Sequence, residues 1–187
     1  MKKVPLNILS VTIFVLLIGC ATLSRNECLE ANWFEIGHKD GMNGKPRALF
    51  QRHVDACIKH GVNANRNAYY AGRDEGLRIY CTGNSGYEQG RLGRKYHYVC
   101  PPDLEPEFLN AYYEGREIYE YEKKVAYLER QLKKIRKQIK EKEKDLYSNK
   151  LSDEQKANIR SEIGSLNKKY HNVVRRLISL SKMKPCY

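Results

Sequence analysis

The amino-acid sequence predicts an all-α protein, in which a small disulfide-supported bundle of short, glycine-rich helices is followed by a long antiparallel coiled-coil hairpin. The distribution of glycine indicates the bundle of short helices, because eleven of the thirteen glycines lie between residues 20 and 119. Apolar side chains spaced alternately three and four residues apart indicate the second part, since this spacing is typical of coiled coils. The scattered cysteines are typical of disulfides in a protein exported to an oxidising compartment.

Residues 1–19 have the features of an export signal. Lys2 and Lys3 precede a mostly apolar stretch that ends beside a small residue. The run Leu17-Ile18-Gly19-Cys20 resembles the lipobox of bacterial lipoproteins, which implies that Cys20 is acylated and begins the mature chain. We therefore expect a tether over residues 20–27. A single transmembrane anchor is the alternative, but about 11 apolar residues are too few to span a bilayer.

The lipobox resemblance also implies a location. Ala21, rather than an aspartate, follows Cys20, and by resemblance to the general lipoprotein rule this implies sorting to the outer membrane. We expect a lipid-anchored protein of the cell envelope, on the periplasmic face of the outer membrane, with the membrane as its first partner. Export to this compartment excludes nucleic acid as a partner.

Residues 28–119 form the expected glycine- and tyrosine-rich helical domain. An aromatic residue, two further residues, a glycine and a basic residue recur in four copies, whose glycines are Gly37, Gly72, Gly90 and Gly115. Other small residues stand four positions from these glycines, so they share one face of a helix. Glycine inside a helix costs about 1 kcal/mol relative to alanine, so its repetition predicts helices with unusually close backbones. The copies are 35, 18 and 25 residues apart, which is too irregular for a solenoid.

Turn-forming residues divide this domain into short helices. We expect helices over residues 30–42, 47–59, 66–80 and 86–96, and a further helix from about residue 104 with Pro106 in its first turn. If the first two helices fold back on each other, Cys28 approaches Cys57, and Cys81–Cys100 then follows by elimination. A zinc site is the competing interpretation, but the cysteines lack the close spacing of structural zinc ligands, so no metal is expected. Cys186 is left without an assigned partner.

The motifs of this domain together resemble a known family. The resemblance is carried by Trp33, Gly37, Asp40-Gly41, Gly44 and Cys57, by Tyr69-x-x-Gly72-Arg73-x-x-Gly76-Leu77 with Tyr80-Cys81, and by Gly86-Tyr87-x-x-Gly90-x-x-Gly93-x-x-Tyr96 to Cys100-Pro101. This pattern is similar to domain of unknown function 2799, a family found in lipoproteins of the Gram-negative envelope. The resemblance implies class and compartment, and it brings no established activity. The C-terminal extension lies outside it.

Three arginines stand four residues after tyrosines, at a spacing that lets a guanidinium lie over a ring on a helix. The pairs are Tyr69 with Arg73, Tyr87 with Arg91, and Tyr112 with Arg116. We favour a structural role, in which each arginine stacks on its tyrosine for about 0.5–1 kcal/mol. The alternative is that the three pairs converge on a groove for an anionic or glycan ligand.

The hairpin is expected over residues 120–182, with a tail over residues 183–187. Ser152-x-x-Gln155 resembles a capping box that opens the second arm. In an antiparallel pairing Leu146 faces Ile159, and Val125 faces Leu180. The alternative is an intermolecular coiled coil, which the polar turn between the arms disfavours. The two apolar stripes are Val125, Leu128, Leu132, Ile135, Ile139 and Leu146, and Ile159, Ile163, Leu166, Tyr170, Val173, Leu177 and Leu180.

The positive charge of the mature chain lies in the hairpin and tail. Residues 20–119 contain 13 basic and 13 acidic residues, whereas residues 120–187 contain 19 basic and 9 acidic ones. Such charge can simply keep an exposed helix soluble. An excess of ten beside a neutral domain also suits an anionic partner: phospholipid headgroups, lipopolysaccharide phosphates or acidic envelope polymers. The residues proposed to carry this binding are off the apolar stripe: Lys133, Lys134, Lys137 and Lys140.

No catalytic motif is present in the sequence. Gly-x-Ser-x-Gly, His-Glu-x-x-His and a glycine-rich phosphate loop are all lacking. We therefore expect a non-catalytic interaction or scaffold module that needs no cofactor, binds an anionic envelope component or docks a protein through the hairpin. The rival is a hydrolase of envelope polymers, which a deep pocket joining His53 or His97 with Asp74 or Glu75 would favour.

Overall fold

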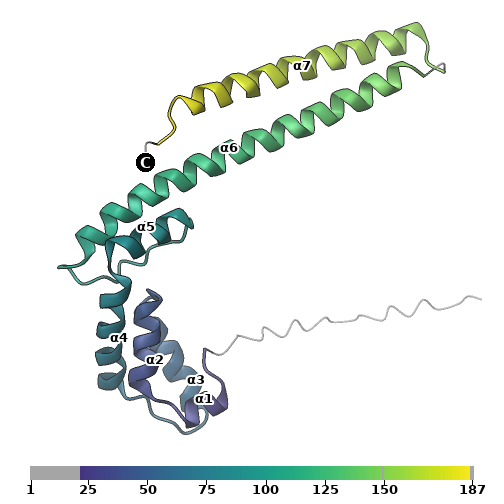
Figure 1. Ribbon diagram of the computed structural model, residues 1–187. Helices are drawn as coiled ribbons and strands as arrows, with labels where there is room; N and C mark the ends of the chain where they lie inside the picture. The colour runs from purple at the N-terminus through teal and green to yellow at the C-terminus, as the bar shows by residue number, and fades with distance from the viewer. Residues whose placement is uncertain (1–21, 149, 186–187) are drawn as a thin grey trace, which may run out of the picture.

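The computed structural model describes residues 22–148 and 150–185. Within these residues it contains seven helices and no strand, which confirms the all-α prediction (Figure 1). A globular part holds the first five helices and the start of the sixth, and the rest of the sixth helix projects from it with the seventh (Figure 1). The helices are α1 (Arg25–Leu29), α2 (Trp33–Met42), α3 (Leu49–Ile58), α4 (Arg66–Tyr80), α5 (Gly83–Arg91), α6 (Glu105–Leu146) and α7 (Asp153–Ser181).

The first glycine unit consists of α2 and α4, which pack with their backbones in contact. A Cβ atom added to Gly37 would lie 1.9 Å from the Tyr69 carbonyl oxygen, and one added to Gly72 would lie 2.0 Å from that of Phe34. One turn further along both helices, a Cβ on Gly76 would lie 2.2 Å from the His38 carbonyl oxygen. Residues later in α2 contact residues later in α4, so the two helices run parallel. The predicted close approach of the glycine faces is therefore confirmed.

The second glycine unit consists of α5 and residues 105–119 of α6, and it repeats this packing. A Cβ on Gly86 would lie 2.3 Å from the Phe108 carbonyl oxygen, and one on Gly90 would lie 2.1 Å from that of Tyr112. The later residue of α5 again contacts the later residue of α6, so these two helices are also parallel. The four copies of the sequence motif thus form two pairs, which explains why their spacing along the chain has no fixed period.

The two units also end their first helices in the same way. Gly44 follows α2 with φ +57° and Gly93 follows α5 with φ +65°, a backbone region that favours glycine. A Cβ at either position would collide with a tyrosine ring, that of Tyr80 at 2.2 Å or that of Tyr119 at 2.3 Å. The capping hydrogen bonds correspond as well, because the amides of the next residues donate to Asp40 and Gln89 carbonyls at 3.0 Å each.

Each unit is closed by one disulfide. Cys28 bonds Cys57 and Cys81 bonds Cys100, so both predicted pairings are confirmed. Each bond joins the chain just before the first helix of a unit to the chain just before its second helix. The cysteines are buried among the aromatic residues of two separate cores, one around Tyr69 and one around Phe108.

Several boundaries differ from those expected. The helix predicted over residues 30–42 starts at Trp33, because Asn32 caps it by accepting from the Phe34 amide at 3.2 Å. The helix predicted over residues 86–96 spans Gly83–Arg91, since Thr82 caps its start and the positive φ of Gly93 ends it. The helices predicted over residues 47–59 and 66–80 are α3 and α4.

The segment predicted as a tether is folded from Thr22 onward. Leu23 is buried in the core around Tyr69, and Ser24 forms a capping box with Glu27 at the start of α1. At the other end of the domain, the predicted boundary between residues 119 and 120 lies inside α6. One continuous helix therefore joins the second glycine unit to the hairpin.

The hairpin packs in the predicted antiparallel register. Its arms share a core around Leu128, Val173 and Leu180, whose buried side chains belong to both apolar stripes. Two polar contacts between the arms agree with that register. Lys142 forms an ion pair with Glu162, and Arg136 donates hydrogen bonds to the Tyr170 hydroxyl. Lys142, which interrupts the stripe, is thus paired across the hairpin. The capping box predicted at Ser152 is present.

Candidate functional site

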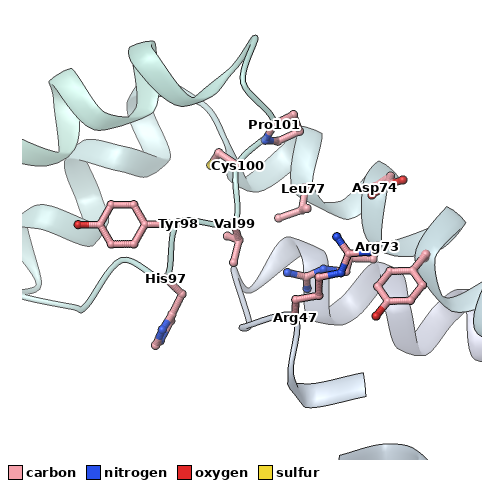
Figure 2. A pocket seen from close by; sticks show the side chains of 10 residues that line it. Arg47, Arg73, Asp74, Leu77, His97, Tyr98, Val99, Cys100 and Pro101 are labelled. Atoms are coloured by element: carbon pink, nitrogen blue, oxygen red, sulfur yellow. The ribbon is translucent and has the colours of Figure 1, made fainter. Parts of the chain in front are cut away.

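A pocket of about 460 Å³ lies where the two glycine units meet. One wall is α4, from Tyr70 to Leu77, and the opposite wall is the loop that joins α5 to α6, over residues 97–101. Arg47, just before α3, completes the lining. Figure 2 shows the side chains of Arg47 and Arg73 together in this space, with His97 and Tyr98 on the loop.

Arg73 is the buried member of this pocket, with only 3 % of its surface exposed. Its Nη2 donates to the Lys45 carbonyl oxygen at 2.6 Å, at the end of α2. Its Nη1 is buried and has no hydrogen-bond partner in the part of the chain that the structure describes. A charged donor left in this condition loses its hydration without compensation. The Arg73 guanidinium therefore holds one donor that the folded protein itself does not use.

The other pocket residues are held more loosely. Arg47 is exposed, and its guanidinium lies 4.9 Å from the centre of the Tyr70 ring. Tyr98 has φ +52° although it is not a glycine, and 73 % of its surface is exposed. A left-handed backbone at a bulky residue is unfavourable, so the surrounding loop must impose it. Strain of this kind often marks a binding site.

Basic side chains continue around the loop to a neighbouring pocket of about 420 Å³. Lys45, Arg94 and Lys95 line this second pocket, and His97 lines both. Asp74 is the acid among the lining residues of the two pockets, and Figure 2 shows its carboxylate directed away from the Arg47 and Arg73 side chains. The junction is therefore locally positive, although residues 20–119 are neutral as a whole.

A second polar cluster is buried inside the first glycine unit. Asp40 Oδ2 accepts from the Tyr69 hydroxyl at 2.7 Å and lies 3.0 Å from His53 Nε2. The other ring nitrogen of His53, Nδ1, lies 2.8 Å from Thr22 Oγ1. Burial, and then the bond to Asp40, raises the pKa of Tyr69 above its usual value. This network ties the start of the folded chain to α2, α3 and α4.

The order Thr22, His53 and Asp40 resembles that of a hydrolase triad, and the three residues line a pocket of about 530 Å³. In such a triad the nucleophile contacts Nε2 of the histidine and the carboxylate contacts Nδ1. Here the contacts are reversed, because Thr22 lies at Nδ1 and Asp40 at Nε2, and His53 is only 4 % exposed. The rival pair, His97 and Asp74, lines one pocket, but both side chains are exposed and, among the residues described, no hydrogen bond joins them.

The three arginines predicted to share one role are used differently. Arg91 forms an ion pair with Glu122 at 3.0 Å, between α5 and α6. Arg116 pairs with Glu120 at 2.9 Å and also donates to the Gly93 carbonyl oxygen. Its guanidinium lies over Tyr119 at 5.3 Å, whereas the expected ring was that of Tyr112. Of the three, Arg73 lies in the pocket described above.

The tyrosines of the predicted pairs also differ in role. Tyr69 is fully buried and bonds Asp40, and Tyr112 donates to the Arg94 carbonyl oxygen at 2.7 Å. Tyr87 is half-buried on α5, where its carbonyl oxygen contacts the Gly115 face. The hydroxyls of Tyr69 and Tyr112 and the carbonyl group of Tyr87 therefore all make contacts inside the glycine units.

The four lysines predicted to bind an anion are all exposed on α6: Lys133, Lys134, Lys137 and Lys140. Lys137 lies 3.8 Å from Glu141, a contact of little energetic consequence at the surface. Lys134 and Lys169, from opposite arms, flank one shallow groove over Ile135 and Val173. The two arms therefore both contribute cations to the same face.

Sequence reasoning missed Asp40, Arg47 and Thr22 as partners of named residues. Asp40 could have been found, because it shares the buried helix face of Gly37 and Gly41 and a carboxylate there needs a partner. No sequence pattern near Arg47 indicates that it lies beside Arg73, since this position depends on how α3 follows α2. Cys20 and Cys186 lie outside the residues that the structure describes.

Among residues 22–148 and 150–185, no helix is long and apolar enough to cross a membrane, and no group of three potential metal ligands is present. No curated protein and no solved structure matches the chain. A family model matches residues 32–117, which span both glycine units and stop before the hairpin. The matching model is that of the family described as "Protein of unknown function (DUF2799)". The resemblance inferred from the glycine and tyrosine motifs is thereby confirmed over these residues.

Proposed function

We propose that this chain is a non-catalytic, lipid-anchored interaction protein of the bacterial cell envelope, which presents its basic hairpin to an anionic partner. The hairpin carries the proposal. It has a core of its own and projects beyond the glycine units (Figure 1). Residues 120–187 hold 19 basic and 9 acidic residues, against 13 of each in residues 20–119. Attraction to an anionic surface follows from such an excess.

The packing of the first described residues supports an anchor with an orienting role. Thr22 is bonded to His53 and Leu23 is buried, and Thr22 stands two residues after Cys20. Two residues reach at most about 7 Å. A lipid on Cys20 would hold the α1 and α3 end of the protein close to its membrane. Figure 1 shows the turn between α6 and α7 at the opposite end of the molecule.

This arrangement suits an arm that reaches away from its own membrane. At about 1.5 Å per residue, the part of α6 beyond the second glycine unit, residues 120–146, extends about 40 Å. Suitable partners at that distance are the phosphates of lipopolysaccharide or lipid headgroups and the acidic polymers of the envelope. Polybasic segments gain about 1 kcal/mol per lysine or arginine near an anionic surface.

Binding to anionic surfaces tests the hairpin. The full chain should co-sediment with lipopolysaccharide or with vesicles that contain phosphatidylglycerol, and high salt should release it, because the Debye length falls to about 3 Å at 1 M salt. Changing Lys133, Lys134, Lys137 and Lys140 together to glutamine should abolish binding and leave the helix content unchanged, since all four are exposed. The matched control changes the same residues to arginine, which keeps the charge and should keep binding. Equal binding by the glutamine variant would leave the hairpin as a spacer or a protein-docking arm.

The anchor is tested separately. Cys20→Ala should leave unprocessed precursor and prevent incorporation of labelled palmitate, because the proposed acylation site is lost. Label that persists in the variant would contradict the anchor and leave the hairpin proposal standing.

A further inference from the structure

We propose that the pocket between the two glycine units binds a small phosphate-bearing ligand, held by Arg73 and Arg47. The inference is independent of the hairpin. It starts from the buried Nη1 of Arg73, a residue that is only 3 % exposed, because this atom has no hydrogen-bond partner among residues 22–148 and 150–185. Among the described residues, the ion pairs likewise include none to Arg73. A buried cation in this condition is strongly favoured to accept an anion.

The second glycine unit shows that the fold does not need an arginine at this position. Tyr112 occupies the corresponding place, since it precedes Gly115 as Arg73 precedes Gly76. Its hydroxyl donates to the Arg94 carbonyl oxygen at 2.7 Å, just as Arg73 Nη2 donates to the Lys45 carbonyl oxygen. One hydroxyl therefore suffices to bridge the end of the first helix. Arg73 makes the same bridge and retains a charge and a further donor inside the pocket.

The surrounding groups suit a phosphoryl group. Arg47 lines the pocket beside Arg73 from another part of the chain, so two guanidinium groups share the same space (Figure 2). A tetrahedral group with three free oxygens can accept from both, whereas a carboxylate offers two oxygens in one plane. Guanidinium groups favour such oxyanions because their donors are arranged as a planar fork. Lys45, Arg94 and Lys95 around the same loop add positive potential.

The remaining lining indicates what the phosphate is attached to. Leu77, Val99 and Pro101 provide apolar surface, and Tyr70 lines the pocket beside Arg47. A volume of about 460 Å³ lies within the usual range of about 300–1,000 Å³ for small-molecule sites. The pocket therefore has room for a phosphate on a body the size of glycerol or a sugar. The source of that group is either a soluble phosphomonoester or a lipid headgroup.

The decisive variant is Arg73→Tyr, which installs the residue that the second glycine unit uses. It should retain the bridge to the Lys45 carbonyl and therefore the melting temperature, while it removes the buried charge. The full chain in uncharged detergent is titrated calorimetrically with inorganic phosphate and with glycerol phosphate. We expect binding by the parent and none by Arg73→Tyr. Arg47→Gln, an exposed change that leaves the core intact, should weaken binding by about tenfold or more. Arg52→Gln removes an equal charge from the exposed face of α3 and should leave the affinity unchanged.

A second arm identifies the source of the phosphate. Vesicles containing phosphatidic acid are offered to the chain with glutamine at Lys133, Lys134, Lys137 and Lys140, with and without Arg73→Tyr. Vesicle binding that needs Arg73, without binding of free phosphate, supports a lipid headgroup, and binding of glycerol phosphate supports a soluble ligand. If neither probe distinguishes the parent from both Arg73→Tyr and Arg47→Gln, the site is refuted, whatever the hairpin binds.

Discussion

The first and second glycine units use the same glycines, capping bonds and aromatic rings, but they bury different polar groups. Both bring two parallel helices into backbone contact and close with one disulfide. In the first unit Tyr69 bonds Asp40, and Asp40 bonds His53. In the second, the corresponding core position is Phe108, which is fully buried and has no hydroxyl. The shared features are those that parallel glycine packing requires, and the polar network of the first unit therefore serves another purpose.

The contacts of His53 and Arg73, two polar groups of the first unit, indicate what this purpose is. His53 bonds Thr22, so the network fixes the N-terminal segment against the domain. Arg73 lines the pocket at the junction, whereas its counterpart Tyr112 is used for bridging. The first unit thus combines the common packing with attachment and a charged pocket, and the second continues directly into the hairpin.

The largest expected losses of stability come from removing the disulfides, and they should be similar in the two units. Replacing both cysteines of a pair by serine should lower the free energy of unfolding by about 3.6 kcal/mol for Cys28–Cys57, which spans 29 residues, on loop-closure entropy alone. For Cys81–Cys100, which spans 19 residues, the same relation predicts about 3.2 kcal/mol. Urea unfolding followed by circular dichroism measures both. A much smaller loss in one pair would show that the reduced chain keeps that unit closed by packing alone.

The glycine contacts should respond alike in the two units. Gly41→Ala and Gly90→Ala, at corresponding positions, place a Cβ 2.3 and 2.1 Å from a carbonyl oxygen of the partner helix. Relief requires a backbone shift, so each should destabilise by about 3 kcal/mol, at the upper end of overpacking. Gly164→Ala in α7 is the matched control, because nothing lies within 4 Å of its added Cβ. It should stabilise by about 1 kcal/mol. Thermal melts that rank the three variants otherwise would exclude close packing as the reason for the glycines.

The smallest expected effect comes from making the first unit resemble the second. Tyr69→Phe removes the hydroxyl bonded to Asp40 and should cost about 1–2 kcal/mol, since Asp40 keeps its contact with His53. The raised pKa of Tyr69 adds a test at high pH. Above about pH 10 the unfolded tyrosine ionises while the folded one stays protonated, so stability is lost as pH rises. Phenylalanine cannot ionise, and the variant should lose less stability between neutral and alkaline pH. An unchanged dependence of stability on alkaline pH would contradict the raised pKa of Tyr69.

Much of the fold was accessible from local patterns. The heptad spacing predicted the hairpin and its register, because the side chains that face each other are set by helical periodicity within each arm. The helix predicted over residues 66–80 agrees with the bounds of α4, and the structure shows that Asn65 caps it. The disulfide Cys28–Cys57 followed from a single turn between neighbouring helices. In each case the partners are close in sequence or share one period.

The sequence by itself determined that glycine faces exist, that backbones approach closely there, and which residues stay off the hairpin core. The tertiary structure decided which face meets which, because the four faces are chemically alike and nothing local distinguishes their partners. Loop lengths and disulfides select α2 with α4 and α5 with α6. Only that choice places Arg47 beside Arg73 and Asp40 beside His53 and Tyr69. Buried polar contacts of this kind depend on where distant segments meet in space, which helical spacing alone does not specify.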